Sequence, residues 1–141
     1  MTDRRARRRP GENRRHLMEA GLIEFGLFGF HGASTKAIAE RAGVPQPHVY
    51  ANFSTKQELF LACVDGALAQ LVDAGHAPSF RPDAQQARLV VQAVASSRDP
   101  DMGDRLRTML SAVERELGSE SFAAVLLAGM AALRAADSHA G

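Results

Sequence analysis

The sequence predicts an all-α fold of about seven helices. Apolar residues recur at intervals of three and four along most of the 141-residue chain, which is the period of a helix with one buried face. Residues that start or stop helices, chiefly Ser, Asp, Pro and Gly, stand between these stretches. No stretch long enough for a β-strand alternates between apolar and polar residues, and no hairpin signal is present. Because 45% of the residues are hydrophobic, the chain can form a real core.

The chain begins with a basic segment. Residues 1–13 hold five arginines, a proline and a glycine, which predicts a mobile arm that either contacts a polyanion or is simply a solvated chain end. A helix is predicted from Arg14, and Gly29 can end it. Its apolar face consists of Leu17, Gly21, Phe25 and Phe28.

Two short helices are predicted next. Ser34 is the candidate N-cap of the first, and Gly43 stops it. The second begins near Pro47 and is barely two turns long, because proline is tolerated in the first turn of a helix. Proline also disfavours the α conformation in the residue before it, so we expect Gln46 at or beside the cap.

Four longer helices complete the prediction. Ser54 and Gln57 form a capping-box pattern for a fourth helix that ends near Gly75, with Leu59, Phe60, Cys63, Ala67 and Leu71 on its apolar side. Residues 76–82 contain two prolines and form a connection. The fifth helix is expected at about 82–97, with Leu89, Val90 and Val94 apolar. The sixth starts at Asp99-Pro100 and the last covers about 119–136, with Gly118 between them.

Charge is unevenly distributed along the chain. Residues 1–56 hold ten Lys or Arg against five Asp or Glu, whereas residues 57–141 hold seven against eleven. A basic first part and an acidic second part indicate that only one end of the molecule faces a polyanion.

Several classes of protein are disfavoured. No segment reaches the roughly 20 apolar residues of a membrane span, and no signal peptide is evident. We therefore expect a cytoplasmic protein without membrane contact. The single cysteine, Cys63, excludes an internal disulfide. The five histidines lack metal-ligand spacing, and no phosphate loop or nucleophile elbow is present. We therefore expect that the protein is not an enzyme and that it binds neither a metal nor a cofactor.

The two short helices, joined by Gly43-Val44-Pro45, form a helix-turn-helix pattern over about residues 34–53. Ala39 is small enough for a close approach between the helices, Gly43 permits the sharp turn, and Val44 and Val49 fill the space between them. The second helix can then present its outer face to the major groove of DNA.

The segment STKAIAERAGVPQPHVYANFSTKQELFLA resembles the DNA-binding domain of the tetracycline-repressor (TetR) family. The shared features are a Thr-Lys pair, Ile-Ala, Ala-Gly-Val, Gln-Pro, a Tyr inside the recognition helix, a Phe that closes it, and a Lys that opens the next helix. The preceding GLIEFGLFGF matches the first helix of the family. The resemblance covers residues 14–65, and later helices are similar to the family's effector and dimer domain only in a general way.

The resemblance implies roles for eight residues. Lys36, Gln46, Pro47 and His48 stand where family members contact base edges. Glutamine can pair with adenine, and lysine can donate to guanine. Thr35, Tyr50 and Lys56 stand where the family contacts phosphates, which set register rather than sequence preference. Asn52 could reach either partner. Plainer roles are a packing role for Tyr50 and solvated surface positions for Lys36, His48 and Lys56.

The sequence also departs from the family pattern. Pro45 replaces a common capping Ser or Thr, and Ala51 replaces a residue that is often basic. By length, about two helices are absent after Gly75, which argues against an ordinary enclosed ligand pocket.

The resemblance implies that the last two helices pair with those of a second copy. The last helix is apolar nearly all round, so we expect it to be buried on more than one side, in a dimer or as a core helix within one chain. A small hydrophobic effector could lie near Phe60, Cys63, Val64 and Leu68, although their spacing also suits core residues. Cys63 could in addition act as a thiol sensor.

The expected organisation is a basic arm (1–13), a helix-turn-helix domain (14–56) and a shortened effector and dimerisation domain (57–141). The expected function is a homodimeric transcriptional repressor that binds a palindromic operator in double-stranded DNA and is released by a small effector. The alternative is a truncated family member that forms heterodimers and has no operator of its own.

Overall fold

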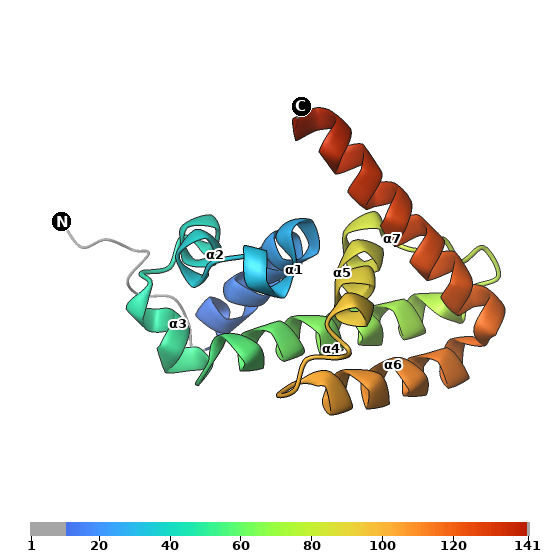
Figure 1. Cartoon of the computed structure of the whole chain (residues 1–141), viewed down its shortest axis with the longest axis horizontal. Helices are drawn as coiled ribbons and strands as arrows, with labels where there is room; N and C mark the ends of the chain where they lie inside the picture. The colour runs from blue at the N-terminus through green and yellow to red at the C-terminus, as the bar shows by residue number, and fades with distance from the viewer. Residues whose placement is uncertain (1–10, 141) are drawn as a thin grey trace.

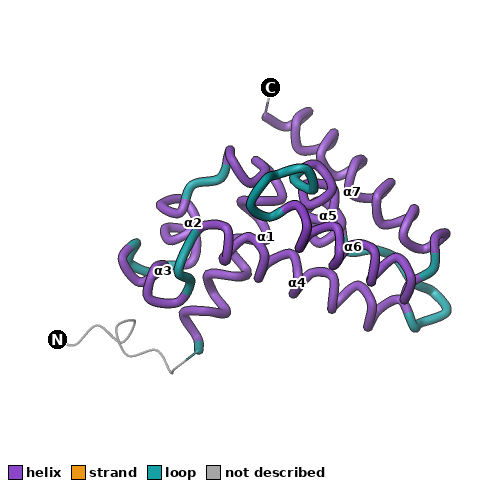
Figure 2. Tube along the Cα trace, turned by 60° about the horizontal axis from the view of Figure 1, so that its bottom comes forward, coloured by secondary structure: helices purple, strands orange, loops and turns teal. Residues whose placement is uncertain are grey.

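The computed structural model describes residues 11–140, with side chains up to residue 136. Within that range the chain forms seven helices and no strand (Figure 2), which confirms the predicted fold class. The helices are α1 (Glu12–Gly32), α2 (Thr35–Ala42), α3 (Pro47–Asn52), α4 (Lys56–Gly75), α5 (Ala84–Ala95), α6 (Gly103–Leu117) and α7 (Ser119–Ala140). Most of the predicted arm, residues 1–10, lies outside the described residues.

The helices fall into two groups along α4. Helices α2 and α3 lie at one end of the molecule, and α6 and α7 lie toward the other (Figure 1). Helix α4 runs between the two groups, with α6 packed along its lower side in Figure 1, and α5 packs against α1, α4, α6 and α7. The core therefore centres on α4 and α5, and its most deeply buried side chains include Phe25, Phe60, Leu89 and Leu106.

Gly29 interrupts α1 near its end. Its φ of 77° and ψ of 176° are not helical, and the positive φ suits glycine, which has no Cβ to clash. The chain leaves the helix where predicted, but one more turn follows, to Gly32. This change of direction brings Phe30 against the core, with ring centres 6.3 Å from Phe25 and 5.3 Å from Phe60.

The two short helices begin as predicted. The Ala37 N–H donates to Ser34 Oγ at 3.0 Å, which caps α2, and α3 starts at Pro47. Gln46, however, adopts the α conformation (φ −53°, ψ −40°), against expectation. The reason is that the turn already starts at Pro45: its carbonyl accepts from His48 N–H at 2.9 Å, and the Gln46 carbonyl accepts from Val49 N–H at 3.0 Å. These bonds offset the steric preference of a residue that precedes proline.

Helix α4 is capped by Thr55 and not by Ser54. Thr55 Oγ1 accepts from Glu58 N–H at 3.1 Å, so the predicted capping box lies one residue too early. The Glu58 carboxylate is paired with Arg105 of α6 at 2.9 Å. The predicted apolar face is confirmed, because Leu59, Phe60, Cys63, Ala67 and Leu71 are all buried.

The starts of α5 and α6 differ from the prediction. Asp83 caps α5 by accepting from Gln86 N–H, so this helix begins two residues after Pro82. Asp99 does act as a cap, but its carboxylate accepts from Asp101 and Met102 N–H and closes a turn that precedes α6. Val94 is 41% exposed, so its predicted place on the buried face is wrong.

Helix α7 crosses α5 at a glycine. A Cβ at Gly129 would clash with the Ala87 carbonyl oxygen and would lie 2.7 Å from the Ala87 carbonyl carbon and from Val91 Cγ2. The two backbones therefore touch at this point, and they can do so because residue 129 has no side chain.

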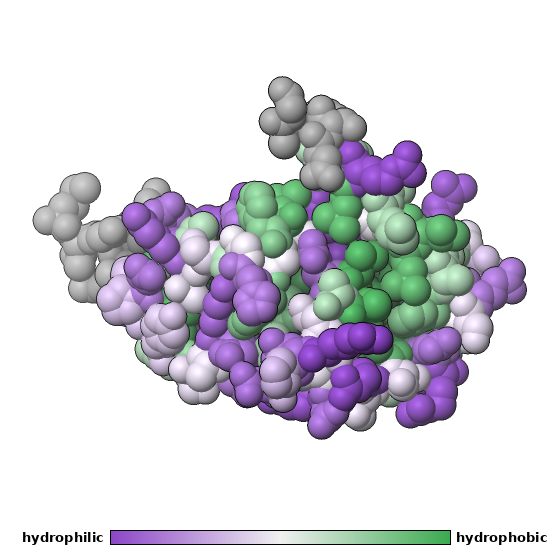
Figure 3. Space-filling model, viewed as in Figure 1, coloured by the Kyte–Doolittle hydropathy of each residue, from purple (hydrophilic) through white to green (hydrophobic). Residues whose placement is uncertain are grey.

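Only one side of α7 is buried within the chain. Phe122, Val125 and Gly129 face the core, whereas Leu127 is 70% exposed and Met130 55%. Figure 3 shows apolar side chains gathered over this part of the surface. By length and composition, Ser119–Ala136 would also suit a membrane span, with a mean hydropathy of 1.3, which corrects the expectation that no segment does. Its close packing on α5 is that of a helix in a folded domain.

Candidate nucleic-acid interface

A buried ion pair fixes α2 on α1. Arg41 Nε and Arg41 Nη2 each lie 2.9 Å from Glu24 Oε1. The Glu24 side chain is 9% exposed and that of Arg41 43%. Because Glu24 is almost fully enclosed, the guanidinium is the group that compensates its charge, and the pair adds to the apolar contacts that hold α2 in place.

The turn between α2 and α3 has the geometry that the motif requires. Gly43 has φ 69°, a conformation that favours glycine, and the Val44 N–H donates to the Ala39 carbonyl at 3.0 Å. Ala39, Val44 and Val49 are buried between the helices. The outer side of α3 is left facing solvent.

Three of the predicted contact residues meet at the junction of α2 and α3. Gln46 Nε2 donates to Thr35 Oγ1 at 3.4 Å, and the same oxygen lies 3.4 Å from the Tyr50 hydroxyl. Tyr50 is 52% exposed. These long, exposed contacts leave the polar groups free to bind a partner.

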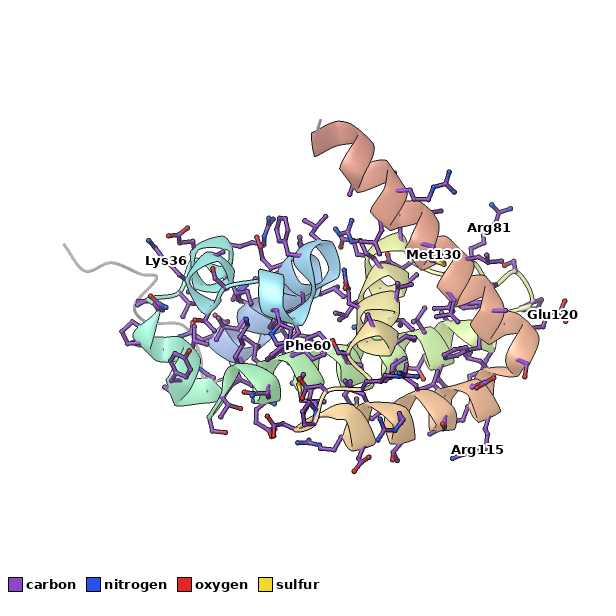
Figure 4. The ribbon with its side chains drawn as sticks, viewed as in Figure 1. Lys36, Phe60, Arg81, Arg115, Glu120 and Met130 are labelled. Carbon is purple, nitrogen blue, oxygen red and sulfur yellow. The ribbon has the colours of Figure 1, made fainter. Side chains whose placement is uncertain are left out.

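The other predicted base-contact residues lie around this junction. Pro47 and His48 form the exposed first turn of α3. Lys36 projects from α2 into solvent at the same end of the molecule (Figure 4). One end of the protein therefore presents an amide, an imidazole, a phenol and an ammonium group.

Asn52 and Lys56 are held more firmly. The Asn52 side-chain amide donates to the His48 carbonyl at 2.8 Å, so it is engaged with the backbone of its own helix. Lys56 Nζ lies 4.7 Å from the centre of the Phe30 ring. Partial burial there lowers the pKa of the Lys56 ammonium.

Arg14 contacts the end of α3 and was not singled out by sequence reasoning. Its guanidinium carbon lies 4.4 Å from the centre of the Phe53 ring, and Nη1 donates to the Asn52 carbonyl at 3.3 Å. The two partners are 38 positions or more away in the chain, so no local pattern indicates which arginine of a basic segment reaches α3.

The four residues proposed to bind an effector are core residues in this structure. Phe60, Cys63, Val64 and Leu68 are at most 3% exposed. Only Cys63 also borders a groove, which lies between α1 and α4 and has a volume of about 340 Å³. A larger groove of about 730 Å³ lies between α4, α6 and the end of α3. The four residues do not together line a pocket.

Burial makes Cys63 a poor thiol sensor. Desolvation raises the pKa of its thiol to about 12, although the positive charge of Arg14 acts in the opposite direction. The thiol also donates to the Met18 carbonyl at 3.5 Å. A thiol that stays protonated at neutral pH reacts slowly, because the thiolate is the nucleophile.

We expect Ellman's reagent at pH 8 to modify the native protein far more slowly than the urea-unfolded protein. The unfolded thiol ionises near pH 8.5 and the folded one only near pH 12, so its contribution to stability is lost as pH rises above about 8.5. Cys63→Ala should remove that part of the pH dependence of the melting temperature. Rapid native modification at pH 8 would contradict the burial of this thiol.

Comparison with known proteins identifies the motif. A family model described as "Bacterial regulatory proteins, tetR family" matches residues 17–63. Residues 17–63 of this chain are therefore a TetR-family helix-turn-helix segment. The match covers most of α1, all of α2 and α3, and the first turns of α4, and it agrees with the expected resemblance.

Curated HTH-type transcriptional regulators share this segment. The transcriptional activator FasR of Mycolicibacterium smegmatis is 41% identical over 71 residues, which are 50% of this chain and 32% of that protein. The regulator RutR of Escherichia coli is 38% identical over 69 residues, 48% of this chain and 31% of RutR. The matched segment thus spans about a third of each relative. Both relatives are described as transcriptional regulators.

The fold extends beyond this segment. A TetR-family transcriptional regulator from Mesorhizobium loti superimposes with a TM-score of 0.55 at 21% identity, and the match covers 96% of this chain and 72% of that protein. The TetR fold therefore includes the C-terminal helices of the present chain.

Proposed function

We propose that this protein binds a palindromic operator in double-stranded DNA as a homodimer and represses transcription in the cytoplasm. The observation that carries the proposal is the exposed junction where Gln46 and Tyr50 meet Thr35. Their polar groups stand at the edge of a helix that the rest of the fold leaves open. A major groove about 12 Å wide accepts one such helix.

Sequence preference would come from the first turn of α3 and from α2. Gln46 is exposed and can pair with the N6 and N7 atoms of adenine. His48 and Lys36 are exposed beside it and can donate to guanine or to other acceptors. The Pro47 ring can pack against a thymine methyl group.

Phosphate contacts would come from the flanks of the same surface. The Thr35 and Tyr50 hydroxyls lie at the N-terminal end of α2, where the helix dipole favours an anion. Lys56 stands at the N-terminal end of α4, where a positive charge is unfavourable by itself. A nearby phosphate would explain its presence there.

The exposed face of α7 supports the homodimer. Leu127 and Met130 are large and exposed, and the smaller Ala124 and Ala131 are exposed between their turns. Paired with the same helix of a second copy, this face would be covered. The exposed side of α6 is charged, with Arg107, Glu114 and Arg115 among its residues, so it would form the polar rim of the interface. A two-fold dimer matches a palindromic site.

Release by a small hydrophobic effector is part of the proposal. Since Phe60, Val64 and Leu68 are packed in the core, the groove beside Cys63, with its floor of Met18, Leu22 and Ala67, is the place such a molecule could enter. Arg14 also borders this groove, and its contact with α3 gives an effector a route to the DNA-binding surface.

A gel-shift titration with the DNA upstream of the protein's own gene tests the proposal. We expect a saturable complex with two protomers per duplex, whose log affinity falls linearly with log salt concentration. Sedimentation of the free protein should give a dimer. A specific shift by the protein would refute the alternative, a heterodimerising member without an operator. Absence of any specific shift, together with a heterodimer formed with a longer TetR relative, would support that alternative and refute the main proposal.

Substitutions at the surface should separate the two kinds of contact. Tyr50→Phe combined with Lys56→Ala should weaken binding to all duplexes, and the salt slope should fall by about one, because only Lys56 carries a charge that neutralises a phosphate. Gln46→Ala should relax preference at one base pair by about 1–3 kcal/mol and leave the slope unchanged. Arg81→Ala is the matched control, because it removes an exposed charge in the connection between α4 and α5, far from Lys36 (Figure 4). If Gln46→Ala changed neither affinity nor preference, its base contact would be disproved.

A further inference from the structure

The recognition helix α3 depends on its neighbours to hold its shape. It has six residues, and so short a helix is not stable alone. Its N-terminal end is held by the turn that starts at Pro45, where the carbonyl accepts from His48 N–H. Its C-terminal end has two features, the buried Phe53 ring and the Arg14 side chain.

Arg14 joins this C-terminal end to α1. Its guanidinium stacks over the Phe53 ring at 4.4 Å and donates to the Asn52 carbonyl at 3.3 Å. That carbonyl is one of the acceptors that a helix leaves unpaired at its end, where the helix dipole also favours a cation. Among the residues that the structure describes, no carboxylate pairs with Arg14.

Arg15 provides a contrast at the next position. It lies 3.9 Å from Glu19, one turn along the same helix, and both side chains are more than 60% exposed. It has the same charge as Arg14 and is its neighbour in the chain, but its ion pair is with Glu19 of its own helix and not with a group of α3. Any effect that arises from charge alone should therefore be the same for both arginines.

We infer that Arg14 is a positioning residue for DNA recognition, which holds the C-terminal end of α3 against α1 through Asn52 and Phe53 and does not bind a phosphate. The inference rests on the proposed function, because positioning matters only if α3 enters the groove. A well-oriented α3 would bind its operator more tightly, whereas binding to random DNA, which depends on phosphate contacts, would change little.

A fluorescence measurement tests the contact without DNA. The chain has one tyrosine, Tyr50, and no tryptophan, so tyrosine emission reports on α3 itself. Arg14→Ala should lower the anisotropy of Tyr50 and raise its quenching by acrylamide, whereas Arg15→Ala should change neither. Equal values for the two variants would overturn the inference.

The DNA measurement uses a duplex selected by the wild-type protein from a random library, and a random duplex as reference. Arg14→Ala should bind the selected duplex about tenfold more weakly than Arg15→Ala does, since the variant lacks both a stacked cation and a hydrogen bond to the helix end. Affinity for the random duplex and the salt slope should be the same for both variants. A salt slope about one smaller for Arg14→Ala alone would show a phosphate contact and overturn the positioning role.

Phe53→Leu completes the test as a cycle. Leucine keeps the buried position apolar but removes the ring on which Arg14 stacks. If Arg14 acts through that ring, the second substitution should add little to the first. The affinity of the double variant for the selected duplex should then lie within about twofold of that of the weaker-binding single variant. Full additivity of the two effects would refute the shared contact. If the library yielded no selected duplex, the proposed function would fail, while the fluorescence comparison would still decide whether Arg14 holds α3.

Discussion

Gly129→Leu is expected to destabilise the protein by about 4 kcal/mol, a large part of the roughly 5–15 kcal/mol that holds a domain together. The new side chain would meet the backbone of Ala87 and the side chain of Val91. Backbone atoms inside a helix cannot rotate away, so α7 would have to separate from α5. Gly129→Ala should cost about 2 kcal/mol, even though alanine favours a helix over glycine by about 1 kcal/mol.

Gly66→Ala is the matched control, because Gly66 also lies inside a helix. A Cβ there would meet Met18 Cε at 3.3 Å, the far end of a flexible side chain. Since the methionine side chain can change its rotamer to make room, the higher helix propensity of alanine should prevail. The variant should therefore be about 0.5 kcal/mol more stable than the wild type. Urea unfolding followed by circular dichroism at 222 nm measures both changes. A Gly129→Ala variant as stable as Gly66→Ala would show that α5 and α7 do not touch at this crossing.

Arg41→Ala is expected to cost about 2–3 kcal/mol of stability and to weaken operator binding as well. The substitution leaves the buried Glu24 carboxylate without its partner, which costs about 3–5 kcal/mol for a fully buried pair. The value here is smaller because the Arg41 side chain is 43% exposed and water can reach part of the site. Helix α2 loses its link to α1, so Thr35 and Lys36 lose their fixed places.

Glu24→Gln in the same chain should restore most of the stability, since the uncompensated charge is then gone. Arg15→Ala breaks an exposed pair with Glu19 and should change stability by less than about 0.5 kcal/mol. The same urea titrations measure these values. If Arg41→Ala proved as mild as Arg15→Ala, the Glu24–Arg41 pair would have no role in fixing α2.

Local rules predicted most helix starts. Ser34 and Pro47 were recognisable because their effect acts on the next few residues, and the structure places α2 and α3 accordingly. The same rules left a choice between Ser54 and Thr55, which can both cap a helix. In the structure Thr55 accepts the hydrogen bond from Glu58 N–H. The choice between the two residues depends on the path of the chain after α3.

Features that depend on distant parts of the chain could not be predicted in this way. Val94 fits the apolar stripe of a helix. Which side of α5 is buried, however, depends on how α5 packs against the other helices, and in the folded chain Val94 is exposed. The stacking of Arg14 on Phe53 likewise needs the folded arrangement of α1 and α3. Phe60, Val64 and Leu68 have the apolar character of a ligand site and of a core alike, and in the folded chain they are core residues.

The contact between α1 and α5 bears on how such regulators can be recombined. Gln92 of α5 donates to the Gly26 carbonyl of α1 at 3.1 Å, and the missing side chain at residue 26 admits the Arg88–Leu89 part of α5. A hybrid that joins this N-terminal domain to the C-terminal half of another regulator at residue 56 would break that match. A working chimera would therefore need compatible residues at positions 26 and 92, because the two halves are joined by the packing of α1 against α5 as well as by α4.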